Sequence, residues 1–275
     1  MGAILKTITL LIAMVWAALT AWSQIIHGGV VTPHQIEQRL RSAPESNEDR
    51  QQAIAQMFRD AGCAPDQLDL RPLRHSKFAN VVCTVPGTTG QVIVAGAHFD
   101  HTKDGDGIID NWSGASIIAD VMQRLLSEPR RHTFVFVAFA DEEGGLRGSH
   151  DFVTRLSREE AANIRAMVNI DSLGLGPIAV WRTHANASLF DMAVQTAETL
   201  KMRLDVVNVD GEGDGDSSSF REKKIAVIDF HSVRPEAFHI LHSKDDTFQA
   251  VRIADYLDSF RLLASYLDYI DSHLQ

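Results

Sequence analysis

Residues 132–143 read HTFVFVAFADEE, and this stretch decides the fold class. Its first nine residues form a nearly continuous apolar run, which is typical of a strand that is buried on both faces of a sheet. Residues 166–170 and 225–230 have the same character. These runs predict a sheet whose central strands are parallel and covered on both sides.

Amphipathic segments lie between and around these runs. Ser113 is a candidate helix N-cap; after it, apolar residues recur four apart from 117 to 126, and Pro129 ends the predicted helix. The turn sequence PGTTG separates two short β-branched runs and predicts strand, turn and strand. The remaining expected elements are helices over 33–41, 45–61, 189–200 and 253–270, and the two strands are 80–85 and 92–97. Strands alternating with helices predict an α/β fold, a three-layer α/β/α sandwich around a mixed, largely parallel sheet.

The composition suits one large globular domain, which we place at residues 24–275. The chain has 275 residues, 45% of them apolar and 23% charged, with a net charge of −10. An acidic chain without a Lys/Arg run repels phosphate backbones, so we expect no nucleic-acid partner. The same acidity is what a chain rich in carboxylate metal ligands would have.

The first 23 residues resemble an export signal. Lys6 is their only charge, and the apolar run from Ile8 to Trp22 is 15 residues long, which is shorter than the roughly 20 residues of a membrane-spanning helix. Small residues at Ala21 and Ser23 predict signal peptide cleavage after residue 23. The alternative is an uncleaved N-terminal anchor. Either way, we expect a secreted or periplasmic protein.

If the protein is exported, its two cysteines can form a disulfide. The chain has an even number of cysteines, Cys63 and Cys83, and the compartments outside the cytoplasm permit disulfides. A bridge between them would tie the end of a helix to a strand. The alternative is two buried free thiols, since cysteine is among the most buried residue types.

Histidines and carboxylates follow several of the predicted strands. His98 and Asp100 follow residues 92–97, Glu142 and Glu143 follow residues 132–140, and Asp171 follows residues 166–170. Ligands of such sheets gather at the carboxyl ends of the strands. Two further elements contribute candidates: Asp110 lies just ahead of the Ser113 helix, and His239 and His242 lie in the loop before the last helix.

Such a group of side chains needs a positive charge among them. Taken singly, each carboxylate could be a helix cap, a turn residue or solvated surface. Carboxylates and histidines that converge lose solvation or repel one another unless a cation lies between them. Nitrogen and oxygen donors without thiolate suit Zn²⁺, with Mn²⁺ or Co²⁺ as substitutes. Five candidate ligands exceed the needs of one tetrahedral ion and suit two ions that share a bridging carboxylate.

Five sequence blocks, in order, resemble those of the M28 family of zinc aminopeptidases. They are GAHFD at 96–100, DNWSGA at 110–115, FADEEGGLRGS at 139–149, NID at 169–171 and HSKDDT at 242–247. The resemblance covers almost all of the chain after residue 45. It implies a zinc exopeptidase-like fold and an enzyme that hydrolyses N-terminal residues from peptides with a free N-terminus; the first 23 residues would make this enzyme an exported one.

The resemblance also implies a role for each matching residue. One zinc would be held by His98, Asp110 and Asp171, and the other by Asp110, Glu143 and His242, which gives two Zn²⁺ per chain. Glu142 would be the general base for a metal-bound water, and the Asp100 carboxylate would orient His98. An adjacent ligand and base are reasonable where a strand end is kinked, and a carboxylate two residues from a histidine can accept its second ring N–H.

Two departures and three alternatives accompany this interpretation. Leu241 stands where the family often has a tyrosine, and Ser217 follows Asp216 where many members have a histidine. Both departures concern specificity more than the reaction.

His239 is the alternative to His242 as the last ligand. The alternative functions are a glutaminyl cyclase-like single-zinc enzyme and an inactive ectodomain that only binds a partner. The run from Glu142 to Ser149 favours the peptidase, and the presence of all five ligands argues against an inactive protein.

Overall fold

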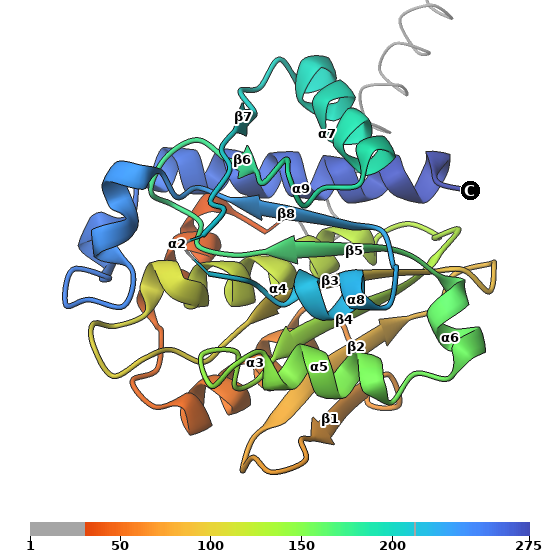
Figure 1. The fold of residues 1–275 in the computed structure, drawn as a ribbon, viewed down its shortest axis with the longest axis horizontal. Helices are drawn as coiled ribbons and strands as arrows, with labels where there is room; N and C mark the ends of the chain where they lie inside the picture. The colour runs from red at the N-terminus through yellow and green to blue at the C-terminus, as the bar shows by residue number, and fades with distance from the viewer. Residues whose placement is uncertain (1–30, 212) are drawn as a thin grey trace, which may run out of the picture.

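The computed structural model describes residues 31–275 except residue 212, so the predicted signal segment lies outside the described residues. The described part contains one eight-stranded sheet in the order β1-β2-β4-β3-β5-β8-β6-β7 (Figure 1). None of the helices in this part is long and apolar enough to cross a membrane. The strands are β1 Leu68–Pro72, β2 Ala79–Val85, β3 Val92–His98, β4 Thr133–Phe139, β5 Ile164–Ile170, β6 Ala179–Val180, β7 Asp205–Val206 and β8 Val227–His231.

The sheet is mixed, with a parallel centre. Strands β4, β3, β5 and β8 are parallel to one another. The pairings of β1 with β2, of β2 with β4 and of β6 with β8 are antiparallel. The strands on either side of the PGTTG turn are present, but they do not pair with each other, because β4 lies between them. The predicted fold class, including the largely parallel sheet, is confirmed.

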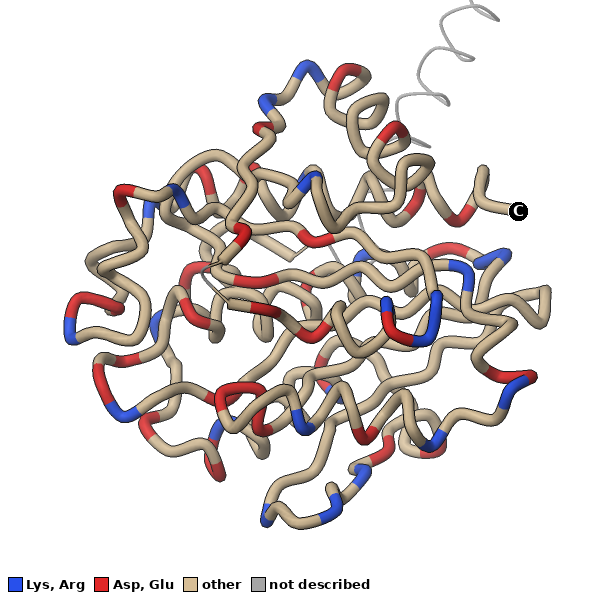
Figure 2. Tube along the Cα trace, in the orientation of Figure 1, with Lys and Arg blue, Asp and Glu red and all other residues tan. Residues whose placement is uncertain are grey.

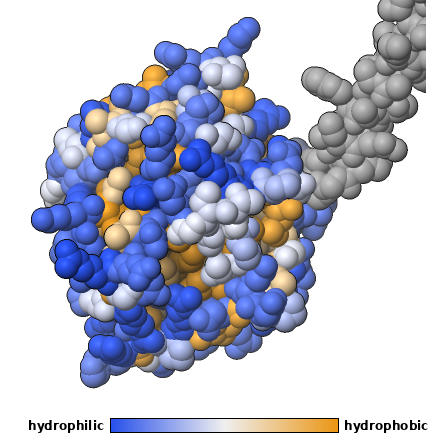
Figure 3. Space-filling model, turned by 90° about the vertical axis from the view of Figure 1, so that its right-hand side faces the viewer, coloured by the Kyte–Doolittle hydropathy of each residue, from blue (hydrophilic) through white to orange (hydrophobic). Residues whose placement is uncertain are grey.

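Helices cover both faces of the sheet (Figure 1). Alternate residues of β3 show the two faces: Ile93 belongs to the larger apolar core and Val94 to the smaller one. The larger core contains side chains of α2 Pro33–Arg41, α3 Asn47–Asp60, α4 Ser113–Leu125, α7 Ala187–Leu200 and α9 Ile253–His273. The opposite face is covered by α5 Arg147–Thr154, α6 Arg158–Asn163 and α8 Ser217–Glu222. Hydrophilic side chains cover most of the molecular face shown in Figure 3, with smaller apolar areas between them.

Two local predictions have different outcomes. Cys63, just after α3, and Cys83, in β2, form a disulfide, so the helix end is tied to the strand. Ser113, however, is not the N-cap of α4. The side chain of Asn111 accepts the N–H of Gly114 at 2.8 Å, while the Ser113 hydroxyl donates to the carbonyl of Ile109 at 2.7 Å. The acceptor for this N–H thus lies two residues before Ser113, in the irregular segment Ile108–Trp112.

Candidate metal centre

Five elements bring the candidate ligands to one edge of the sheet. His98 ends β3, and Asp171 follows β5. After β4, Asp141 adopts a left-handed conformation with φ 60° and turns the chain, so that Glu142 and Glu143 face the same edge. Asp110 lies in the segment before α4, and His242 follows the 3-10 turn Pro235–Ile240. Figure 2 shows Asp and Glu segments close together in this region.

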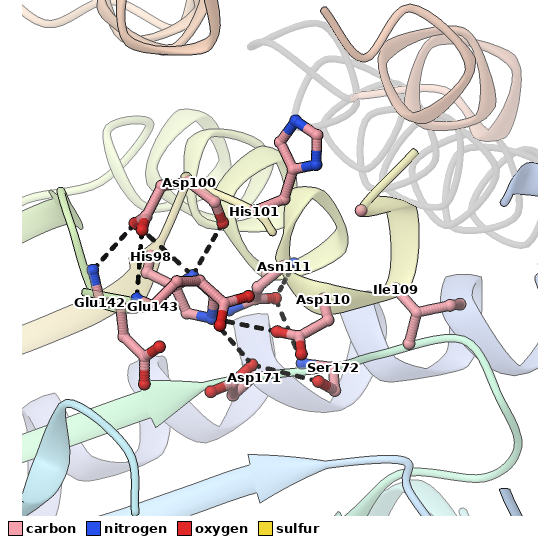
Figure 4. Close-up of polar contacts among 12 residues, drawn as sticks. His98, Asp100, His101, Ile109, Asp110, Asn111, Glu142, Glu143, Asp171 and Ser172 are labelled. Carbon is pink, nitrogen blue, oxygen red and sulfur yellow. Dashed lines mark hydrogen bonds and ion pairs between the residues drawn. The ribbon is translucent and has the colours of Figure 1, made fainter. Parts of the chain in front are cut away.

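The side chains form two groups, each of which could hold a cation. His98, Glu142 and Asp171 offer ligand atoms within 4.8 Å of one another, and so do Asp110, Glu143 and His242. Asp110 connects the two groups, because its Oδ1 lies 3.2 Å from Nε2 of His98 (Figure 4). Its Oδ2 lies 3.1 Å from Nε2 of His242. Two oxygens that face two histidines form the arrangement expected of a bridging carboxylate.

The remaining distances complete the two groups. Nε2 of His98 lies 3.4 Å from Oδ1 of Asp171. Nε2 of His242 lies 3.0 Å from Oε2 of Glu143. His239 belongs to neither group and is exposed on its 3-10 turn. Of the two histidines in this loop, the structure therefore brings His242 to the candidate centre.

Asp100 makes contacts that differ from the expected ones. Its carboxylate accepts the backbone N–H groups of Glu142 at 3.0 Å and of Glu143 at 3.1 Å. Nδ1 of His98 lies 3.1 Å from the main-chain carbonyl of Asp100, but 3.8 Å from its carboxylate. Asp100 thus directs Nε2 of His98 toward the centre through its carbonyl, while its carboxylate fixes the turn that carries the two glutamates.

The electrostatics of the cluster call for positive charge. Hydrogen bonds with Asp110 and Glu143 raise the pKa of His242 to about 10. Burial lowers the pKa of His98, but Glu142, Asp171 and Asp110 outweigh it and hold this pKa well above its usual value. Burial works to raise the pKa of Asp110, yet hydrogen bonds from His242 and His98 keep it below its ordinary value. Protons on the two histidines thus balance the carboxylates, and a divalent cation would displace them.

The pKa of Glu142 is shifted in the direction opposite to that of Asp110. Burial raises the pKa of Glu142 to about 9; His98 works against this rise, and the negative charges of Asp216 and Asp171 add to it. A carboxylate with a raised pKa beside a cluster of ligands is a typical candidate for proton transfer. Oε1 of Glu143 is buried and accepts no hydrogen bond. This oxygen is therefore free to bind a cation in the group that Glu143 forms with Asp110 and His242. This atom and the nitrogen and oxygen donor set fit zinc.

A cleft opens beside the two groups. Its lining includes the candidate ligands and the loop of residues 213–215. Burial raises the pKa of Asp229 to about 6 and lowers the pKa of His231 to about 4, so burial disfavours the charged form of both lining residues. The apolar part of the lining comes from Trp181, Val209, Phe230, Val233, Phe238 and Leu241.

The structure also reveals supporting residues that the sequence analysis does not identify. Asn111 donates to the carbonyl of Ile170 at 3.0 Å and accepts the N–H of Ser172 at 3.2 Å, so it links the Asp110 segment to the end of β5. Asp246 accepts two N–H groups of the Asp110 segment. Asp246 lies within the block HSKDDT and Asn111 within the block DNWSGA, so the blocks could have pointed to both residues.

Known proteins that are similar to this chain include aminopeptidases and a glutaminyl cyclase. A stretch of 99 residues, 35% of this chain and 20% of the relative, is 35% identical to the probable lipoprotein aminopeptidase LpqL of Mycobacterium tuberculosis, so the chain spans only a part of that protein's length. The structure of the LapA aminopeptidase of Legionella pneumophila matches with a TM-score of 0.77 and 19% identity over 90% of this chain and 73% of LapA. A glutaminyl cyclase from an Acidobacteriales bacterium matches with a TM-score of 0.73 and 17% identity over 89% of this chain and 95% of the cyclase.

The family assignment rests on a longer match. At such low identities, the two structural similarities establish the shared fold and no more. The model of peptidase family M28, however, matches residues 80–267, which include every residue of the two candidate groups. The chain therefore belongs to peptidase family M28.

Proposed function

We propose that this chain is a di-zinc aminopeptidase that releases N-terminal residues from peptides. The observation that carries the proposal is the position of Asp110, whose two oxygens face His98 and His242 separately at 3.2 and 3.1 Å. A single-zinc enzyme has no need of a carboxylate that faces two histidines. Membership of family M28 supports the same activity.

Each side chain has a proposed role. His98, Asp110 and Asp171 would hold one zinc, and Asp110, Glu143 and His242 the other. When bound, zinc supplies a Lewis acid for the scissile carbonyl and lowers the pKa of water. The Glu142 carboxylate would take a proton from the attacking water and pass it to the leaving amine nitrogen. Asp100 would keep Glu142 and Glu143 in place through their N–H groups.

The surroundings of the site support a peptide substrate with a free N-terminus. The α-ammonium group of such a peptide is positively charged and would be attracted to the acidic cluster. The apolar lining from Trp181, Phe238 and Leu241 would accommodate the first side chain of the substrate. Leu241 offers no hydroxyl where many family members have a tyrosine, so oxyanion stabilisation would depend on the cations or on another donor.

A peptide that begins with glutamine tests the proposal against its main alternative. The purified chain, loaded with zinc, should release free glutamine from this peptide and should leave the N-acetylated peptide intact. A chelator should abolish the release, and added zinc should restore it. Release of ammonia with the peptide chain intact would instead identify a glutaminyl cyclase, whose fold this chain shares. No reaction on any unblocked peptide would favour an inactive binding protein.

We also propose that the protein is exported. The short apolar run of residues 8–22 and the disulfide between Cys63 and Cys83 support a location outside the cytoplasm. The name of the relative LpqL, a probable lipoprotein aminopeptidase, supports it too. N-terminal sequencing of exported material should find a chain that starts near Gln24. A chain that retains residues 1–23 would indicate an anchor.

A further inference from the structure

Asp246 connects the segment of the bridging ligand to the segment of His242. It lies four residues after His242, and only 1% of its surface is exposed. Its Oδ1 accepts the N–H of Ile109 at 2.6 Å, and its Oδ2 accepts the N–H of Asp110 at 3.1 Å. One carboxylate therefore holds two successive backbone groups of a segment 136 to 137 residues away in the sequence.

The backbone of Asp246 strengthens the same junction. Its N–H donates to the carbonyl of Ser243 at 3.1 Å, and its carbonyl accepts the N–H of Asp106 at 2.9 Å. A Cβ at Gly105 would lie 2.1 Å from the Ser243 carbonyl oxygen, so the two segments approach too closely for any residue but glycine there. The segment of residues 105–110 and the turn of residues 242–246 thus form one unit.

The buried guanidinium of Arg50 fixes the other side of this unit. It donates to the carbonyls of Phe99 at 3.2 Å and Gly107 at 3.1 Å, and also to the carbonyl of Asp106. The chain from the end of β3 to the Asp110 segment is therefore held by Arg50 on one side and by Asp246 on the other. Of these two side chains, Asp246 is the one that also fixes this chain to the loop of His242.

We propose that Asp246 is a positioning residue that sets the affinity of the centre for zinc. A bridging carboxylate must present its two oxygens to two sites at once, and this requires its backbone to be fixed within a fraction of an ångström. Asp246 fixes the backbone N–H of Asp110 and, through its own turn, the position of His242. This inference rests on the proposed di-zinc function, because it concerns the same ligands.

The chemistry of the contact requires a carboxylate. Two parallel N–H groups need two acceptor oxygens, which a carboxylate has and an amide does not. In Asp246→Asn, one of the two backbone N–H groups would lose its acceptor oxygen. That N–H group would instead face the NH₂ group of the asparagine, which is also a donor. Loss of a residue that supports a metal ligand typically weakens metal binding by about 10- to 100-fold. We expect this effect for at least one of the two zinc ions.

Asp271 provides a matched control within the same chain. Its Oδ1 accepts the N–H of His132 at 2.7 Å, and its Oδ2 accepts the N–H of Arg131 at 3.0 Å. Asp271 is 5% exposed and lies on α9 beside the start of β4, at the opposite end of that strand from Glu142. Asp271→Asn therefore makes the same chemical change to a pair of backbone N–H contacts, away from the ligands; Oδ1 of Asp271 also lies 3.1 Å from Nδ1 of His132. Asp245→Asn, at an exposed neighbour of Asp246, controls for the loss of one negative charge near the centre.

The test measures zinc dissociation constants of the full chain by competition with a chromophoric chelator, and unfolding free energies of the zinc-free forms in urea. Asp246→Asn should raise at least one dissociation constant by about 10- to 100-fold, while Asp271→Asn and Asp245→Asn should leave both unchanged. Asp271→Asn should lower the unfolding free energy as Asp246→Asn does. If Asp246→Asn fails to fold, Asp246→Ser, which keeps one acceptor, should show the same loss of zinc affinity.

Three results would overturn the inference. If Asp246→Asn binds zinc as tightly as the wild type does, Asp246 has a purely structural role. An equal loss of zinc affinity in Asp271→Asn would trace the effect to general destabilisation. In both cases the wild type still binds two zinc ions, so the proposed function stands. If the wild type itself binds no zinc, the proposed function fails and the inference fails with it.

Discussion

Glu142 and Glu143 are adjacent, yet we propose different tasks for them. Their backbone N–H groups are held by the two oxygens of the same carboxylate, Asp100. The side chain of Glu143 lies 3.0 Å from Nε2 of His242, whereas that of Glu142 joins His98 and Asp171. Glu142→Gln and Glu143→Gln change one oxygen to an NH₂ group at neighbouring positions. Each variant is therefore the control for the other.

The two substitutions should have different effects. Glu142→Gln removes the group that moves the proton and should lower kcat by about a hundred- to ten-thousand-fold, or about 3 to 5 kcal/mol at 1.36 kcal/mol per tenfold. It should keep both zinc ions and KM, because the amide still fits the site. Glu143→Gln should instead lose zinc at the group of Asp110 and His242, because an amide oxygen is a weaker ligand than a carboxylate.

The assay sets zinc content beside turnover of an aminoacyl anilide for both variants and the wild type. Excess zinc should restore part of the activity of Glu143→Gln and none of that of Glu142→Gln. If Glu142→Gln loses zinc while Glu143→Gln keeps it, the two roles are reversed. Full activity in both variants would refute the reasoning, because neither a base nor a ligand can be replaced without effect.

Two further predictions concern stability. Cys63 and Cys83 lie 20 residues apart. Reduction of their disulfide should lower the unfolding free energy, measured in urea, by about 3 kcal/mol, because the reduced unfolded chain regains loop entropy. Equal stability with and without reductant would contradict this. Burial lowers the pKa of His231 to about 4 from 6.5, so below pH 6.5 the unfolded chain takes up a proton that the folded chain does not. Between pH 6.5 and pH 5, this difference should cost about 2 kcal/mol of unfolding free energy. His231→Gln should lose less stability over this interval, and an unchanged pH dependence would exclude His231 as the cause.

Local patterns were enough to predict the central layers of the fold. The run of residues 132–140 and the apolar period of residues 253–270 each determine an element by themselves, because burial on both faces or along one stripe leaves a clear pattern. β1 leaves no such pattern, since three of its five residues are exposed at the sheet edge. The two-residue strands β6 and β7 are too short to show a periodic sequence pattern. The position of β4 between β2 and β3 depends on long-range pairing, which local sequence does not record.

The candidate site divides in the same way. His98, Glu142, Glu143 and Asp171 can be placed together because they follow strands of one parallel sheet. The choice of His242 over His239 depends on how a 3-10 turn directs two histidines, and spacing alone left it open. Arg50 occurs on a helix among polar residues and looks like a surface residue, because its partners are carbonyls from distant loops. Contacts between such loops are invisible until the chain is folded.

The number of zinc ions per chain tests the central claim most directly. The purified protein should be freed of metal, saturated with zinc, dialysed against metal-free buffer and measured by elemental analysis together with protein concentration. The position of Asp110 between His98 and His242 predicts two zinc ions per chain. One zinc ion or none at saturation would contradict the di-zinc centre.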